Sequence, residues 1–222
     1  MLARELISDV VPALKTSDQG TRALSWMEVF RVKHLPIVNH SEFLGLISDA
    51  DIYDLNNPQE PVGNHNLSLV KPFVNEDQHI YEVIELLSRL KLTLVPVLNF
   101  EKHYLGVITM EDLTRRFASL SALQQPGGII ELEMHSKDYS LAEISQIVES
   151  NNARILSLYM AAAPDDQDKV RVTIKTNQTD LTSVIQTFNR YNYIIVASHM
   201  LDEDLDEFYQ ERFDVFLKYL NT

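Results

Sequence analysis

The sequence predicts a mixed α/β and α+β chain: a pair of small α/β domains, a βαββαβ domain of the ferredoxin-like kind, and a C-terminal amphipathic helix. Three observations predict this organisation. Residues 7–53 and 67–113 form an internal repeat, offset by about 60 residues. A different order of predicted strands and helices begins after Gly128. Acidic residues and apolar residues at helical spacing then fill the segment 201–222.

Composition narrows the class of protein. The 222 residues suffice for several small domains that each bury a core. A net charge of -13 argues against nucleic acid or an anionic membrane as the main partner, since Lys/Arg surfaces bind both. The chain has no cysteine, which excludes disulfides and thiolate chemistry. It also has no stretch near the roughly 20 apolar residues of a membrane helix and no signal-peptide core, so we expect a cytoplasmic protein.

Each copy of the repeat has the same predicted order of elements. An extended start is followed by a helix, a strand, a tight turn, a second strand and a second helix. The first helices span about 18–31 in one copy and begin near 77 in the other, with apolar stripes at helical spacing. Pro36 and Pro96 bias the preceding residues to extended geometry, which starts the strands. The predicted turns are 39–41 and 99–101.

Each copy also contains one glycine motif, Gly45–Asp51 in the first and Gly106–Asp112 in the second. Each consists of a glycine, two apolar β-formers, a hydroxyl residue, two spacers and an aspartate. We expect a strand that ends at the hydroxyl residue, which then caps a helix whose first turn holds the aspartate. Hydroxyl, carboxylate and free backbone N–H groups would meet at this corner, a geometry suited to a sugar and a phosphate.

The proline-containing strand, the turn and the glycine motif, each present twice in this order, resemble the CBS domain family. The pair resembles the tandem CBS (Bateman) module over about residues 1–118. The resemblance implies two copies packed sheet to sheet with approximate two-fold symmetry, and clefts that bind AMP, ADP, ATP or S-adenosylmethionine. It implies that ribose hydroxyls are held by Thr109, Asp112, Ser48 and Asp51. It also implies a base pocket at Leu35, Pro36, Val95 and Pro96.

The two glycine motifs differ in the charges that follow them. Arg115 and Arg116 lie one helical turn beyond Asp112, whereas Asp51 is followed by Asp54 and no cation. Because the planar guanidinium fork suits phosphate, we expect the second motif to bind a phosphorylated nucleotide and the first an uncharged adenosine moiety or nothing. The resemblance adds two candidate phosphate-binding cations, Lys33 and His34. Solvation of a charged surface is the alternative role of all four basic residues.

Residues 124–128, a Gln-Gln-Pro-Gly-Gly run, break the chain sharply. We therefore predict CBS domains at 1–60 and 61–123, an ACT-like domain at 124–200, and an acidic amphipathic helix at 201–222. In the third domain, strands near 130–134, 153–161, 170–175 and 193–197 alternate with helices near 141–149 and 180–188.

This βαββαβ order predicts that the first and third strands of the domain pair antiparallel, with Glu131 and Glu133 facing Arg171 and Lys175. After a CBS pair, such a unit resembles the ACT family of amino-acid sensors, and the whole order resembles acetoin-utilisation-type proteins. ACT domains that bind amino acids usually carry a glycine after the first strand. The loop 135–140 has none, so we expect this domain to form a homodimer through its sheet rather than to bind an amino acid.

No catalytic residues are found: the chain has no G-x-S-x-G, no H-E-x-x-H and no phosphate-binding glycine loop. The seven histidines are scattered, with no metal-ligand spacing, so no metal and no catalytic cofactor are expected. The sequence favours a non-catalytic regulatory protein that binds an adenine nucleotide. The alternative is a constitutive oligomeric scaffold with empty clefts that recruits a protein target through residues 201–222, which would otherwise pack on their own domain or on the dimer mate.

Overall fold

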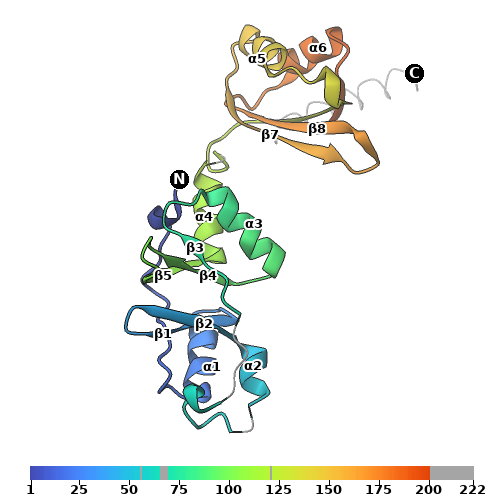
Figure 1. Ribbon diagram of the computed structural model, residues 1–222. Coiled ribbons are helices and arrows are strands. Elements are labelled where there is room, and N and C mark those ends of the chain that lie inside the picture. The colour runs from blue at the N-terminus through green and yellow to red at the C-terminus, as the bar shows by residue number, and fades with distance from the viewer. Residues whose placement is uncertain (56, 66–69, 121, 201–222) are drawn as a thin grey trace, which may run out of the picture. The chain divides into compact units, whose positions relative to one another are not determined.

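The computed structural model describes residues 1–55, 57–65, 70–120 and 122–200 (Figure 1). The chain divides into two compact units, Met1–Phe117 and Ala118–Thr222, which are described separately. This division falls inside the helix α4, Met110–Leu120, whereas the sequence suggests a boundary near residue 123. The helix predicted at 201–222 lies outside the described residues.

The first unit contains the predicted order of elements twice. Its first half comprises η1 (Ala3–Glu5), α1 (Gly20–Val29), β1 (His34–Asn39), β2 (Glu42–Ser48) and α2 (Asp49–Tyr53). Its second half comprises η2 (Val62–Asn64), β3 (Val74–Asn75), α3 (Ile80–Leu90), β4 (Leu94–Leu98), β5 (Tyr104–Thr109) and α4. The duplicated helix–strand–turn–strand–helix order is therefore confirmed. The two sheets face each other, and the helices cover their outer sides (Figure 1).

Strand pairing fixes how the two halves correspond. Strands β1 and β2 pair antiparallel, as do β4 and β5. Val74 in β3 pairs parallel with Val97, and in the first half an isolated parallel bridge joins Leu14 to Ile37. Leu14 and Val74 are thus equivalent positions, which gives the repeat an offset of 60 at this point.

The two halves exchange their leading segments. Ser8 forms an antiparallel bridge with Val107 in β5, and its N–H donates to the Val107 carbonyl over 2.8 Å. Leu46 in β2 forms an antiparallel bridge with Val70, and the Leu46 N–H donates to the Val70 carbonyl over 2.9 Å. Each half thereby contributes an edge to the sheet of the other half. One continuous core follows, in which residues of both halves are buried together.

Gly106 allows the first of these exchanges. Its φ is +154°, and a Cβ placed there would lie 2.5 Å from Cγ2 of Ile7. We expect Gly106→Ala to lower the free energy of unfolding of the first unit by about 1–3 kcal/mol, because backbone strain and a clash with the exchanged segment add. Chemical denaturation checks the value. An unchanged midpoint would contradict the close approach of residues 7 and 106.

The second unit forms one antiparallel sheet with helices on one face. Its elements are β6 (Ile129–His135), η3 (Ser136–Asp138), α5 (Leu141–Ser150), β7 (Ile155–Ala163), β8 (Asp166–Thr176), α6 (Thr182–Arg190) and β9 (Ile194–His199). The strand order β7-β8-β6-β9 with antiparallel neighbours is the ferredoxin-like topology, as predicted. Helices α5 and α6 cover one face of the sheet (Figure 1). The hairpin between β7 and β8 is tighter than predicted, because β8 begins at Asp166.

The predicted charge pairing across β6 and β8 is half correct. Glu133 lies opposite Arg171, with Nε and Oε2 3.5 Å apart, and Lys169 Nζ donates to Glu133 Oε1 over 3.2 Å. The hydrogen bond from Lys169 is the main cause that lowers the pKa of Glu133, and Arg171 lowers it further. Glu131 instead lies opposite Thr173, and Lys175 opposite Ile129. The prediction for Glu131 is wrong because residues two apart on one strand cannot both face residues four apart on its neighbour.

Candidate functional site

The two glycine motifs form the predicted strand-to-helix corners. At the first, Asp51 N donates to Ser48 Oγ over 3.1 Å, and Ser48 N and Oγ both donate to Asp51 Oδ2 over 2.7 Å. At the second, Asp112 N donates to Thr109 Oγ1 over 3.0 Å, and that hydroxyl donates to Asp112 Oδ2 over 2.7 Å. These reciprocal bonds start α2 and α4. A carboxylate offers about four lone-pair sites, so each aspartate keeps capacity for further donors.

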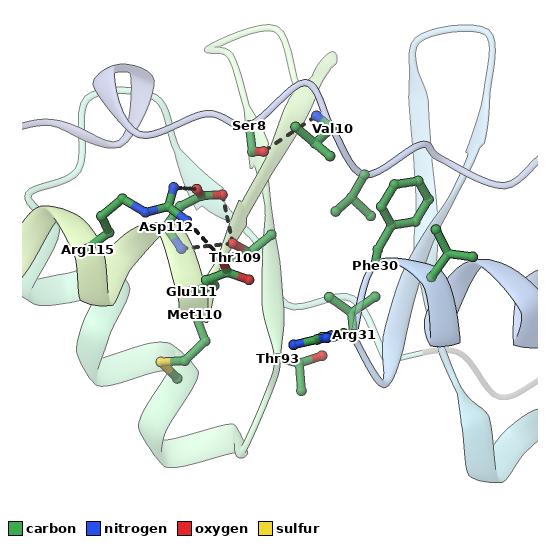
Figure 2. A pocket seen from close by; sticks show the side chains of 13 residues that line it. Ser8, Val10, Phe30, Arg31, Thr93, Thr109, Met110, Glu111, Asp112 and Arg115 are labelled. Carbon is green, nitrogen blue, oxygen red and sulfur yellow. Dashed lines mark hydrogen bonds and ion pairs between the residues drawn. The ribbon is translucent and has the colours of Figure 1, made fainter.

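The second corner forms one wall of a cavity of about 520 Å³ (Figure 2). Its opposite wall comes from the first half of the repeat, namely the exchanged segment and the end of α1. The lining residues with polar side chains include Ser8, Arg31, Thr93, Thr109, Asp112 and Arg115. The structure therefore brings together three of the predicted site residues, Thr109, Asp112 and Arg115, in a space bounded by both halves.

Arg115 is engaged with neighbouring carboxylates. Its Nη2 lies 2.8 Å from Glu111 Oε1 and its Nη1 lies 3.1 Å from Asp112 Oδ1, so the guanidinium turns back along α4 (Figure 2). A phosphate at this wall would compete with two carboxylates for the same donors. Arg116 is exposed and is not among the residues that line the cavity. The phosphate-binding role of both arginines stays a prediction.

Arg31 supplies a cation that the sequence analysis did not identify. It follows α1 in the left-handed conformation, at φ 53°, a position where glycine is usual. Its side chain extends toward Thr93 (Figure 2), and both residues line the cavity. Lys91 has the same φ after α3, so both halves place a basic residue in this conformation. A basic residue at equivalent positions of the repeat, 60 residues apart, is the sequence signal that could have identified Arg31 as a candidate.

Lys33 and His34 contact the cavity only through Thr93. The Lys33 N–H donates to Thr93 Oγ1 over 2.9 Å, and His34 Nδ1 lies 3.1 Å from the same oxygen. Burial lowers the pKa of His34, against the opposing effect of the nearby carboxylates of Asp49 and Asp51. His34 is therefore a neutral hydrogen-bonding partner near pH 7. Its expected role as a phosphate-binding cation is not favoured by this environment.

This lowered pKa gives a pH dependence with a definite sign. The folded state disfavours the imidazolium, so the stabilisation by neutral His34 is present above the ordinary pKa of 6.5 and is lost as the pH falls from that value through the lowered pKa of the folded state. We expect His34→Gln to flatten the loss of stability of the first unit between about pH 7 and pH 5. Denaturant titrations across that range measure the slope. The exposed His40→Gln control should keep the wild-type slope, and an unchanged His34→Gln slope would contradict the assignment.

The four residues predicted to form a base pocket lie on β1 and β4. All four are buried, and none is among the residues that line this cavity: Leu35, Pro36, Val95 and Pro96. Their place in a base pocket stays a prediction.

Comparisons with known proteins match part of this chain. The CBS domain family model matches residues 68–119. Inosine-5'-monophosphate dehydrogenase of Methanocaldococcus jannaschii is 25% identical over 114 residues, which are 50% of this chain and 22% of that enzyme. The chain thus spans about a fifth of that curated relative. A CBS domain pair/ACT domain protein of Thermotoga maritima is 20% identical, covers 54% of this chain and 98% of its own, and has a TM-score of 0.48. CBSX2 in complex with AMP is 19% identical, and the match covers 55% of this chain and 96% of the CBSX2 chain with a TM-score of 0.44.

Residues 68–119 thus match the CBS domain family model, and the first half repeats the helix–strand–turn–strand–helix order of that segment. The first unit has the fold of a CBS domain pair, and the second adds a ferredoxin-like domain.

Within residues 1–55, 57–65, 70–120 and 122–200, no cluster of three His, Asp or Glu side chains is arranged to hold a metal ion. Over the same ranges, no helix has both the length and the apolar character needed to cross a membrane.

Proposed function

We propose that this protein is a non-catalytic regulator that binds an adenine nucleotide in the cavity at Thr109 and Asp112. The observation that carries the proposal is the composition of this cavity, which joins an aspartate at a helix N-terminus to a cation, Arg31, from the other half of the repeat. The match of residues 68–119 to a CBS domain supports the same role. The resemblance to CBS pairs, whose clefts bind adenosine-containing ligands, makes the nucleotide the first candidate.

The chemistry of the cavity fits the parts of a nucleotide. The ionised Asp112 can accept from two vicinal ribose hydroxyls, and Thr109 holds this carboxylate in place over 2.7 Å. Arg31 offers a planar fork of donors from the opposite wall. A volume of about 520 Å³ lies within the range of small-molecule sites.

A ligand here would act on both halves at once. Ser8 and Arg31 belong to the first half, whereas Thr109 and Asp112 belong to the second. A nucleotide that contacts all four residues stabilises one packing of the halves over others, by its difference in affinity for them. We propose that the ferredoxin-like unit acts as an ACT-like domain in a homodimer, or senses a second metabolite. The likeness to acetoin-utilisation-type proteins belongs to this proposal.

Isothermal titration with AMP, ADP, ATP and S-adenosylmethionine tests the nucleotide claim. We expect saturable heat for at least one of the four ligands. If that ligand carries a phosphate, the Arg31→Gln variant should bind it roughly tenfold more weakly than the wild type, because a charge-assisted hydrogen bond is lost. Lys91→Gln, which removes the basic residue at the equivalent position of the other half, is the matched control and should bind as the wild type does. A folded protein that gives no heat with any of the four ligands would remove the claim.

A constitutive scaffold is the second candidate. The hydrogen bonds and ion pairs within the second corner favour it. Thr109 with Asp112, and Arg115 with Glu111, already satisfy one another without a ligand. The scaffold recruits its protein target through residues 201–222. A pull-down with the full chain and with residues 1–200 separates the candidates, because the scaffold predicts capture that depends on the tail and is indifferent to nucleotide.

A further inference from the structure

We propose a second ligand site, for a compact anion that bears a phosphate or carboxylate group, beside the turn between β1 and β2. A cavity of about 520 Å³ lies there, and it shares no lining residue with the cavity at Thr109 and Asp112. The lining residues that carry the argument are Ala13, Lys15, Thr16, Ser17, His40 and Tyr104. The site is therefore independent of the proposed nucleotide site.

The repeat provides an internal comparison for this cavity. Leu14 and Val74 occupy equivalent places in parallel pairs with Ile37 and Val97. The turns that follow are also equivalent, as matching bonds show: Lys15 N donates to Asp18 Oδ2 over 2.8 Å, and Asn75 N donates to Gln78 Oε1 over 2.6 Å. The backbone at 14–18 thus matches that at 74–78, and the differences between these two segments reside in the side chains.

The first difference is space. Ala13 stands where the second half has Phe73, so a whole aromatic ring is absent from the first half. In the second half, Lys102 lies 4.5 Å from the centroid of the Phe73 ring and donates to Asn75 Oδ1 over 3.0 Å. Lys102 belongs to the turn 99–103, which is one residue longer than its counterpart 39–42. A ring and a lysine therefore occupy the region that corresponds to the cavity.

The second difference is charge and hydrogen-bonding character. Lys15 replaces an asparagine, the hydroxyls of Thr16 and Ser17 replace two carboxylates, and His40 and Tyr104 replace two phenylalanines. The counterparts are Asn75, Glu76, Asp77 and Phe100 in the second half and, for Tyr104 of β5, Phe43 in β2 of the first half. Each change removes a negative charge or adds a donor. In a chain with a net charge of -13, such a concentration of donors around a cavity selects for an anion.

Tyr104 is held as a neutral donor. Its N–H donates to the Ser41 carbonyl over 2.8 Å, which ties β5 to the turn of the other half. Burial raises the pKa of its phenol. The nearest carboxylate in the sequence, Asp18, already accepts from Lys15 N and pairs with Arg22 over 2.9 Å, so its charge is met elsewhere. Lys15 is left as the charged anchor, with hydroxyls around it.

Titrations with inorganic phosphate and with succinate test the site and separate the two anion types. We expect saturable NMR shifts of the amides at 13–17 and 39–41 with at least one of the two probes. Ala13→Phe and Lys15→Asn install the residues of the second half, and each should weaken binding at least tenfold. Lys137→Asn removes an exposed lysine elsewhere and should leave the affinity unchanged.

Thermal unfolding of the same variants checks that they fold, and nucleotide titration checks that the site at Asp112 is intact. Lys15→Asn keeps the backbone N–H that bonds Asp18, so it should fold as the wild type does. No shifts at 13–17 and 39–41 with either probe, or equal affinity in the folded Lys15→Asn variant, would overturn the proposal. Nucleotide binding should survive both substitutions, so a failure of this site is distinguishable from a failure of the site at Asp112.

Discussion

Asp112→Ala is expected to weaken adenine-nucleotide binding roughly 100-fold, whereas Asp51→Ala should change it less than about threefold. The large loss follows because two ribose hydroxyls would lose a charged acceptor, and each such bond contributes about 1.5–3 kcal/mol. Of the two aspartates, only Asp112 lines the described cavity together with Arg31. Asp51 is followed by Asp54, which disfavours a phosphate at the first corner. Isothermal titration of both variants measures the difference.

The two aspartates control for each other. Each accepts the hydroxyl hydrogen of its capping residue over 2.7 Å at the start of a helix. The structural cost of either substitution should therefore be similar, about 0.5–2 kcal/mol, as for other helix caps. Thermal unfolding checks this equality. Equal losses of affinity, with both variants folded, would contradict the asymmetry between the corners and favour two equivalent sites.

The sequence predicted what depends on local spacing. Ser48 with Asp51 and Thr109 with Asp112 form capped corners because a hydroxyl at the N-cap and a carboxylate three residues later meet in any regular first turn. The ion pair of Arg115 with Glu111 follows the same logic at a spacing of four. This ion pair limits how freely Arg115 can meet a phosphate.

What depends on distant pairing was not predicted. The exchange that joins Ser8 to Val107 and Val70 to Leu46 links segments with no mutual pattern in the sequence. It nevertheless creates the wall of the cavity opposite Thr109. Arg31 and Thr93 belong to the site for the same reason, since each is supplied by a chain turn far from the glycine motif in sequence. The register that turned Glu131 toward Thr173 was likewise set by the whole strand pair.

The two units bury separate hydrophobic cores, which makes a strong test of their independence possible. One core is built from residues between Ala3 and Leu113, the other from residues between Ile130 and Phe188. Phe188 is completely buried in the second core and meets the Tyr193 ring edge to face, with centroids 5.3 Å apart.

Phe188→Ala is expected to lower the free energy of unfolding of the second unit by about 3–5 kcal/mol, because a buried ring is replaced by a cavity. Phe100→Ala, the same change at a side chain that is 73% exposed, should cost less than about 0.5 kcal/mol. Calorimetry should then show an early transition for the second unit alone, and nucleotide titration below the remaining transition should give wild-type affinity. If Phe188→Ala abolishes nucleotide binding, the first unit depends on the second for its fold. Retained binding instead means that a CBS pair carries the ligand site by itself, and that the ferredoxin-like unit can only read or transmit the bound state.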